Sequence, residues 1–200
     1  MPERLAFLSQ REMERAGRFV FERERRRYLA ARCALRERLA RHTGVAPDRL
    51  RIVEDEHGKP FLADRSDCRF NMSHSEDVAL VAISGIGEIG VDIEMLRSIS
   101  DAESLARSHF LPDELHEFLE LEESLRVEAF LRCWTRKEAC LKAVGIGLRG
   151  EPNSVAVGLG EEQVRVRIEL PGGAVLVDVR SVTERPDCIA AVAMVLRNSE

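Results

Sequence analysis

Two hydrophobic periodicities follow one another along the chain in blocks, and their order constrains the fold more than any other feature. A helical repeat of about 3.6 residues runs through 22–41 and returns over 101–144. Apolar or alternating segments typical of strands fill 78–93 and 164–196. Each block of helices precedes a block of strands, without the regular alternation that builds a parallel sheet. The sequence therefore predicts an α+β fold.

The same order divides the chain near residue 100 into two halves. We expect 1–100 and 101–200 to be similar α+β units, each a small antiparallel sheet packed with helices. Ser9 begins a capping-box pattern, Pro112 suits the first turn of a helix, and Gly145 can end one. No strong sequence repeat relates the two halves.

Composition limits the partners and the compartment. The 200 residues carry a formal net charge of −5, so the chain lacks the overall basic excess that favours nucleic-acid binding. The N-terminal residues lack the apolar run of a signal peptide, and no segment reaches the length of a membrane span. The 5 cysteines include no Cys-x-x-Cys pair, which argues against a disulfide framework or a zinc site. We expect a cytoplasmic protein with reduced thiols and with neither nucleic-acid nor membrane partners.

Arginines crowd the polar face of the helix predicted over 22–41. They are Arg23, Arg25, Arg26, Arg27, Arg32 and Arg36. One interpretation is a solvated face whose charge is offset by neighbouring glutamates, and the other is a surface that binds phosphate. Because the chain as a whole is acidic, a phosphate-binding surface must be local.

Two acids share one face of a predicted strand. Asp92 lies within the apolar segment 89–93, and Glu94 directly follows it. The two are two residues apart, and alternate residues of a strand point to the same side. Two neighbouring carboxylates repel one another, and a hard cation between them removes that repulsion. Magnesium is the natural candidate. The alternative is a strand whose outer face is exposed to solvent, and this segment alone favours that alternative.

A third acid interrupts an apolar helix stripe. Phe130, Trp134, Glu138 and Leu141 fall close to one face of the predicted helix. A carboxylate in that position must be paired or bound to metal, because burying it alone is costly. Lys142 lies one turn beyond Glu138, so an ordinary i,i+4 salt bridge is the alternative.

A hydroxyl and an imidazole, Ser73 and His74, precede the strand-like segment at 78–83. They suit phosphate binding better than nucleophilic catalysis, because neighbours on an extended segment point to opposite sides. A lone histidine is more often structural, and Lys59 in its Gly-Lys-Pro turn is by default an exposed lysine.

Four segments, taken together and in order, carry a more specific signal than any one of them. They are GKP at 58–60, FNMSHS at 70–75, GVDIE at 90–94 and WTRKEACLK at 134–142. This series resembles the motifs of the Sfp-type 4′-phosphopantetheinyl transferase family. The resemblance spans roughly 20–150, and the C-terminal strands fit it by length and pattern.

The resemblance implies a monomeric pseudo-dimer of two α+β halves with one active site at their junction. Asp92, Glu94 and Glu138 would hold Mg²⁺ on the pyrophosphate of coenzyme A. Glu138 and Lys142 would be the catalytic residues. Glu138 would accept the serine proton directly or through a water, and Lys142 would neutralise phosphate charge.

The resemblance also implies which residues contact coenzyme A. Ser73, His74 and Lys59 would bind its nucleotide phosphates, and Arg27 matches a basic region used for the same ligand. Further upstream the match loosens, and Arg15 and Arg23 are the weaker counterparts of that region.

The activity implied is transfer of the 4′-phosphopantetheine arm of coenzyme A to a serine of an apo acyl or peptidyl carrier protein, which leaves 3′,5′-ADP. One alternative is a catalytically inactive module that binds coenzyme A and the carrier. Another is a different Mg²⁺-dependent nucleotide transferase, although the chain has no glycine-rich P-loop to support it.

Overall fold

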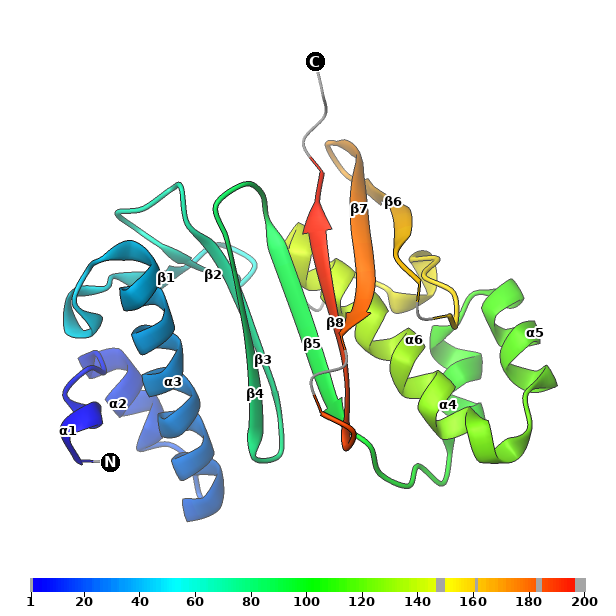
Figure 1. Ribbon diagram of the computed structural model, residues 1–200, viewed down its shortest axis with the longest axis horizontal. Helices are drawn as coiled ribbons and strands as arrows, with labels where there is room; N and C mark the ends of the chain where they lie inside the picture. Colours follow the sequence, from blue (N-terminus) through cyan, green and yellow to red (C-terminus); the bar gives the residue numbers. More distant parts are fainter. Residues whose placement is uncertain (1, 147–149, 161, 183–184, 197–200) are drawn as a thin grey trace.

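The computed structural model describes residues 2–146, 150–160, 162–182 and 185–196. The helices are α1 (Pro2–Leu5), α2 (Gln10–Ala16), α3 (Glu22–Thr43), α4 (Ala102–His109), α5 (Pro112–Glu120) and α6 (Glu123–Val144), with short 3₁₀ helices η1 (Pro47–Arg49) and η3 (Pro152–Ser154). The strands are β1 (Ile52–Glu54), β2 (Pro60–Leu62), β3 (Arg69–Ser75), β4 (Val78–Ser84), β5 (Ile89–Met95), β6 (Val164–Leu170), β7 (Gly173–Val182) and β8 (Cys188–Val195). Helices and antiparallel sheets form two halves, which confirms the α+β prediction (Figure 1). Within the described ranges, no helix is both long and apolar enough to cross a membrane.

The N-terminal half is built around α3. Its buried residues Leu35 and Leu39 pack with Leu62 of β2 and Phe70 of β3. β1 pairs with β2, and β3 pairs with β4, both antiparallel. Figure 1 shows α3 lying beside the β3–β4 hairpin. The helix ends at Gly44, whose φ of 73° lies in the left-handed region that glycine tolerates without strain.

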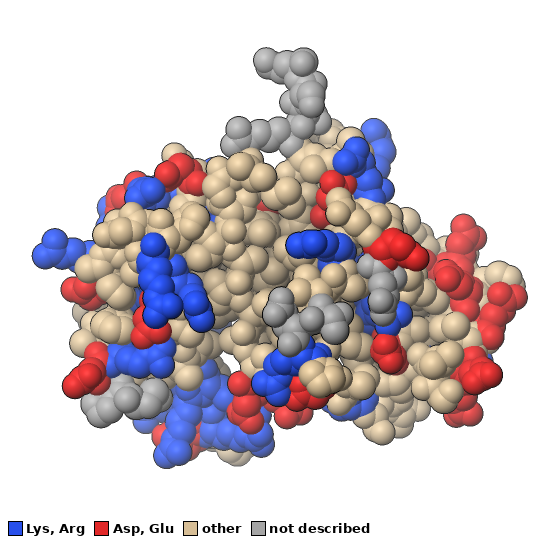
Figure 2. Space-filling model, viewed as in Figure 1, with Lys and Arg blue, Asp and Glu red and all other residues tan. Residues whose placement is uncertain are grey.

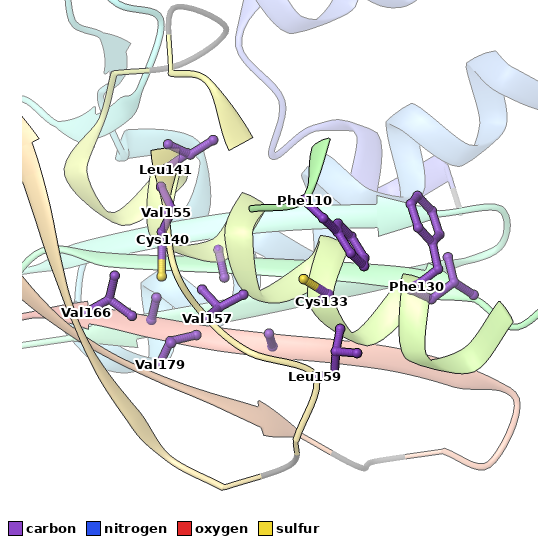
Figure 3. Close-up of a cluster of buried hydrophobic side chains, with 14 of the residues drawn as sticks. Phe110, Phe130, Cys133, Cys140, Leu141, Val155, Val157, Leu159, Val166 and Val179 are labelled. Atoms are coloured by element: carbon purple, nitrogen blue, oxygen red, sulfur yellow. The ribbon is translucent and has the colours of Figure 1, made fainter. Parts of the chain in front are cut away.

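The C-terminal half is a four-stranded antiparallel sheet in the order β5-β8-β7-β6, with α6 packed across it. Phe110, Phe130 and Cys133 are buried together with Val166 and Val179 from the sheet (Figure 3). α4 and α5 pack against α6, completing the cluster. This larger core fixes the position of α6 relative to the sheet.

β5 links the two halves. It follows the β3–β4 hairpin in sequence, yet it pairs with β8, where Val91 lies opposite Val192. The predicted division near residue 100 stays a prediction. β5 precedes that division in sequence and is hydrogen-bonded within the C-terminal sheet.

Candidate active site

Serine side chains join β3 to β5, although the two strands belong to separate sheets. Ser73 Oγ donates a hydrogen bond to Asp92 Oδ1 at 2.8 Å, and Ser75 Oγ donates one to Glu94 Oε2 at 2.9 Å. Alternate residues of a strand share a face, so each acid of β5 meets one serine of β3. The two acids therefore lie at the boundary between the halves.

Gly90 lets α6 approach this same face of β5. A Cβ atom built on Gly90 would overlap the backbone of Ala139 and Ala143. Glycine inside a strand often marks such a close approach of another backbone. The contact brings Glu138 and Lys142, each the residue before one of these alanines, against the acidic face of β5.

Lys142 pairs with Asp92 across the junction. Its Nζ lies 2.5 Å from Asp92 Oδ1 and also donates to Ser73 Oγ at 3.3 Å. Among the described residues, no ion pair joins Lys142 to Glu138, which lies one turn earlier on α6. The i,i+4 salt bridge considered from the sequence is thus replaced by a contact between the two halves.

The second oxygen of Asp92 has no partner. The residue is 4 % exposed, and Oδ2 is buried without a hydrogen bond from any described residue. An unsatisfied buried carboxylate oxygen costs free energy, because it has lost its water and gained nothing in exchange. Asp92 is therefore suited to bind a further cation or donor through Oδ2.

Glu138 lies in an environment that resists its charge. Partial burial is the main cause that raises the pKa of Glu138 above the ordinary glutamate value. The negative charges of Asp92 and Glu94 raise this pKa further, while the Lys142 ammonium lowers it. The three acids are thus close enough to influence one another, although they come from two different elements.

The donor chemistry of these acids fits Mg²⁺, since all three offer hard oxygen ligands and one buried oxygen is unpartnered. In the described part of the chain, however, no group of three or more His, Cys, Asp or Glu side chains gathers closely enough to hold a metal ion. Asp92 is engaged by Ser73 and Lys142, and Glu94 by Ser75. The acids would have to converge for a cation to bind all of them.

A hollow of about 750 Å³ lies between α3 and the β3–β4 hairpin. Its cationic lining includes Arg23, Arg26 and Arg27, with His74 on the hairpin side, and we call it the arginine hollow. Figure 2 shows Lys and Arg atoms gathered at the lower end of α3 and of the hairpin. Arg27 Nη2 is buried and has no hydrogen-bond partner among the described residues. Unsatisfied guanidinium nitrogens of this kind favour a phosphate ligand.

The structure separates the residues assigned to coenzyme A. His74 is exposed and lines the arginine hollow, whereas Ser73 is 8 % exposed and faces Asp92, because neighbours on a strand point to opposite sides. Arg23 lines the arginine hollow. Arg15 does not; it lies over the ring of Tyr28.

Lys59 does not line the arginine hollow either. Its Nζ donates to Glu88 Oε2 and to the carbonyl oxygen of Ala143, both at 2.6 Å, and its side chain is 12 % exposed. A cation at the C-terminus of a helix is favourable, because the last carbonyls lack backbone partners. Lys59 thus holds the end of α6 and is not the exposed turn lysine that was the default interpretation.

Two residues near these sites escaped prediction. Gly90 had a usable signal, because an isolated glycine in a strand pattern indicates a close backbone approach. Asp77 had none. It accepts hydrogen bonds from Arg27 Nε at 2.8 Å and Arg23 Nη2 at 3.3 Å, and these partners lie 50 and 54 residues away in sequence.

Known proteins resemble this chain over most of its length. Residues 88–180 match the family model of the 4′-phosphopantetheinyl transferase superfamily, and residues 2–85 match the model "4′-phosphopantetheinyl transferase, N-terminal". The chain is 38 % identical over 192 residues to the 4′-phosphopantetheinyl transferase HetI of Nostoc sp. strain PCC 7120, covering 94 % of this chain and 79 % of that protein.

Two further proteins are similar at lower identity. The 4′-phosphopantetheinyl transferase Sfp of Bacillus subtilis is 29 % identical over 167 residues, with 84 % of this chain and 73 % of that protein covered. The solved structure of holo-[acyl-carrier-protein] synthase from Thermotoga maritima is 21 % identical and superposes with a TM-score of 0.39, covering 56 % of this chain and 64 % of that one.

Proposed function

The chain belongs to the 4′-phosphopantetheinyl transferase superfamily, and we propose that its catalytic centre is the junction at which α6 meets the acidic face of β5. The activity is transfer of phosphopantetheine to carrier proteins. The observation that carries the proposed site is the buried Asp92 carboxylate, with Oδ1 on Lys142 and Oδ2 without a partner among the described residues.

Asp92, Glu94 and Glu138 are the proposed ligands of Mg²⁺. Their support is the oxygen-only donor set, the unpartnered Oδ2 of Asp92 and the raised pKa of Glu138, which burial raises most and to which the charges of Asp92 and Glu94 add. The ion, when bound, would neutralise charge on the coenzyme A pyrophosphate.

Glu138 is the proposed general base. The entering serine oxygen bonds to the phosphorus next to the pantetheine arm while its proton passes to the Glu138 carboxylate. The bond between that phosphorus and the bridging oxygen breaks, and 3′,5′-ADP leaves with the bonding electron pair. The Lys142 ammonium, already within reach of the Asp92 carboxylate, stabilises the negative charge that develops on the phosphates.

The arginine hollow is the proposed site for the ribose phosphate of coenzyme A. Arg27 and His74 line it, so the assignment of both to this ligand is supported by their position. Ser73 lies on the other face of β3, where its contacts with Asp92 and Lys142 support a position close to the pyrophosphate. For Lys59, the contacts favour a role in holding the end of α6, and its contact with coenzyme A stays a prediction.

A monomer is proposed, because residues of both halves of one chain meet at the site, as the Asp92–Lys142 pair illustrates. The proposed partner is an apo acyl or peptidyl carrier protein. A cytoplasmic location is supported by the five cysteines, all of which are free and buried.

Intact-mass measurement of a carrier protein tests the function. Apo carrier protein incubated with the purified chain, coenzyme A and Mg²⁺ should gain the mass of one phosphopantetheinyl group, and excess chelator should prevent the gain. Binding of coenzyme A without any gain would favour the inactive module. A gain equal to a nucleotidyl group would favour another nucleotide transferase.

A further inference from the structure

A carboxylate of the chain itself occupies the arginine hollow. Asp77 follows Glu76 in the turn between β3 and β4, and it lines the hollow. Its Oδ1 accepts from Arg27 Nε at 2.8 Å, and its Oδ2 accepts from Arg23 Nη2 at 3.3 Å. Two of the guanidinium groups that line the hollow, those of Arg23 and Arg27, are therefore already engaged by an internal anion.

The pair with Asp77 is one that a phosphate can displace. The Asp77 side chain is 69 % exposed, and exposed ion pairs are weak because water screens them and both side chains lose freedom. A phosphate dianion carries more charge and more acceptor oxygens than a carboxylate, and guanidinium groups bind it in the same geometry.

Arg27 does not depend on Asp77 for its position. Its side chain is 19 % exposed, and Nη1 also donates to Glu24 Oε1 at 3.0 Å on the same helix. Its Nη2 is buried without a partner among the described residues, so Asp77 leaves part of this guanidinium unsatisfied. A ligand with more acceptor oxygens than Asp77 can also accept a hydrogen bond from Arg27 Nη2.

The turn that carries Asp77 also contains a strained residue. Glu76 has a φ of 49°, in the left-handed region that residues other than glycine rarely adopt. Hydrogen bonds from Arg27 and then from Arg23 keep the pKa of Asp77 below its ordinary value, so the side chain is an anion at neutral pH. The hairpin tip thus presents a negative charge to the arginines of α3.

The ligand phosphate concerned is the one on the ribose. The pyrophosphate must reach the acids at the junction, which lie on the Ser73 face of β3, whereas the hollow lies on the His74 face. We propose that Asp77 is an internal counter-ion that competes with the 3′-phosphate of coenzyme A for Arg23 and Arg27 and so limits the affinity for this substrate. This inference rests on the function proposed above.

Calorimetric binding of coenzyme A and of 3′-dephospho-coenzyme A, with wild type and Asp77→Asn, tests the competition. Asp77→Asn should lower the Kd for coenzyme A about three- to five-fold, which is the upper range for release of an exposed ion pair. The Kd for 3′-dephospho-coenzyme A should change less than about 1.5-fold, since that ligand lacks the competing group. Thermal melts should show that each variant is folded.

Glu76→Gln is the matched control. Glu76 lines the same hollow and carries the same charge in the same turn, but within the described ranges its side chain makes no hydrogen bond or ion pair, so Glu76→Gln changes the charge without releasing an arginine. Weaker binding by Asp77→Asn would overturn the proposal in favour of a carboxylate that orients the arginines. The proposal would also be overturned if Glu76→Gln lowered the Kd for coenzyme A as much as Asp77→Asn does. It would likewise be overturned if Asp77→Asn lowered the Kd values of both ligands equally. A wild type that binds neither ligand would overturn the proposed function itself, which separates the two failures.

Discussion

Glu138 carries a charge that its surroundings disfavour, and this has consequences for both stability and catalysis. Burial, together with Asp92 and Glu94, raises its pKa in the folded state above the ordinary value of 4.5. Between the unfolded and the folded pKa, the folded chain binds the proton more tightly, so stability falls as pH rises through that window. At neutral pH the ionised Glu138 therefore destabilises the fold, and a base with a raised pKa accepts a proton more readily.

Glu138→Gln separates the catalytic role from a structural one. Glutamine keeps the size of the side chain but cannot accept the serine proton, so kcat should fall at least about 100-fold. The melting temperature at pH 7 should stay the same or rise, because the substitution removes a disfavoured charge. Steady-state kinetics and thermal melts on the same preparation check both. A normal kcat with a lowered melting temperature would make Glu138 a structural residue.

At the scale of elements, the close approach of α6 to β5 assembles the site. The alternation of β5 predicted that Asp92 and Glu94 share a face, and the helical period placed Glu138 in an apolar stripe, because both patterns are local. Local patterns of this kind could not predict the partner of Lys142. Its pairing with Asp92 spans 50 residues of sequence and depends on the depth at which α6 docks.

Gly90→Ala tests this docking. The added methyl group would push α6 away from β5, and overpacking of this kind costs about 1–3 kcal/mol. We expect kcat to fall at least about tenfold, even at temperatures where circular dichroism shows a folded variant, since a small displacement of catalytic groups is costly. Gly172→Ala is the control, because a Cβ at Gly172 would meet no atom within 4 Å. Wild-type kcat in folded Gly90→Ala would contradict the positioning role.

At the scale of the whole molecule, local patterns predicted two α+β halves but not how they are joined. The ladder between β5 and β8 links residues about a hundred positions apart, and nothing in either strand alone selects the other. The buried ion pair between Lys137 and Glu114, whose charged atoms are 2.6 Å apart, was not predicted either. Lys137 lies in the motif at 134–142, in which the functional interpretation concerned the neighbouring Glu138. Such contacts depend on strand register and burial between segments far apart in sequence, and these cannot be predicted from hydrophobic periodicity.

We propose that the acidic face of β5 and the inward face of α6 form one catalytic centre, and Asp92→Ala removes the residue that joins them. The measurement is the intact mass of an apo carrier protein after incubation with coenzyme A, Mg²⁺ and the variant. Asp92→Ala should be folded and should leave the carrier in its apo form, because Lys142 loses its partner and the proposed cation loses a ligand. Asp64→Ala, which removes an exposed acid paired with Arg51, should convert the carrier as wild type does. Full conversion of the carrier by Asp92→Ala would mean that the catalytic centre lies elsewhere.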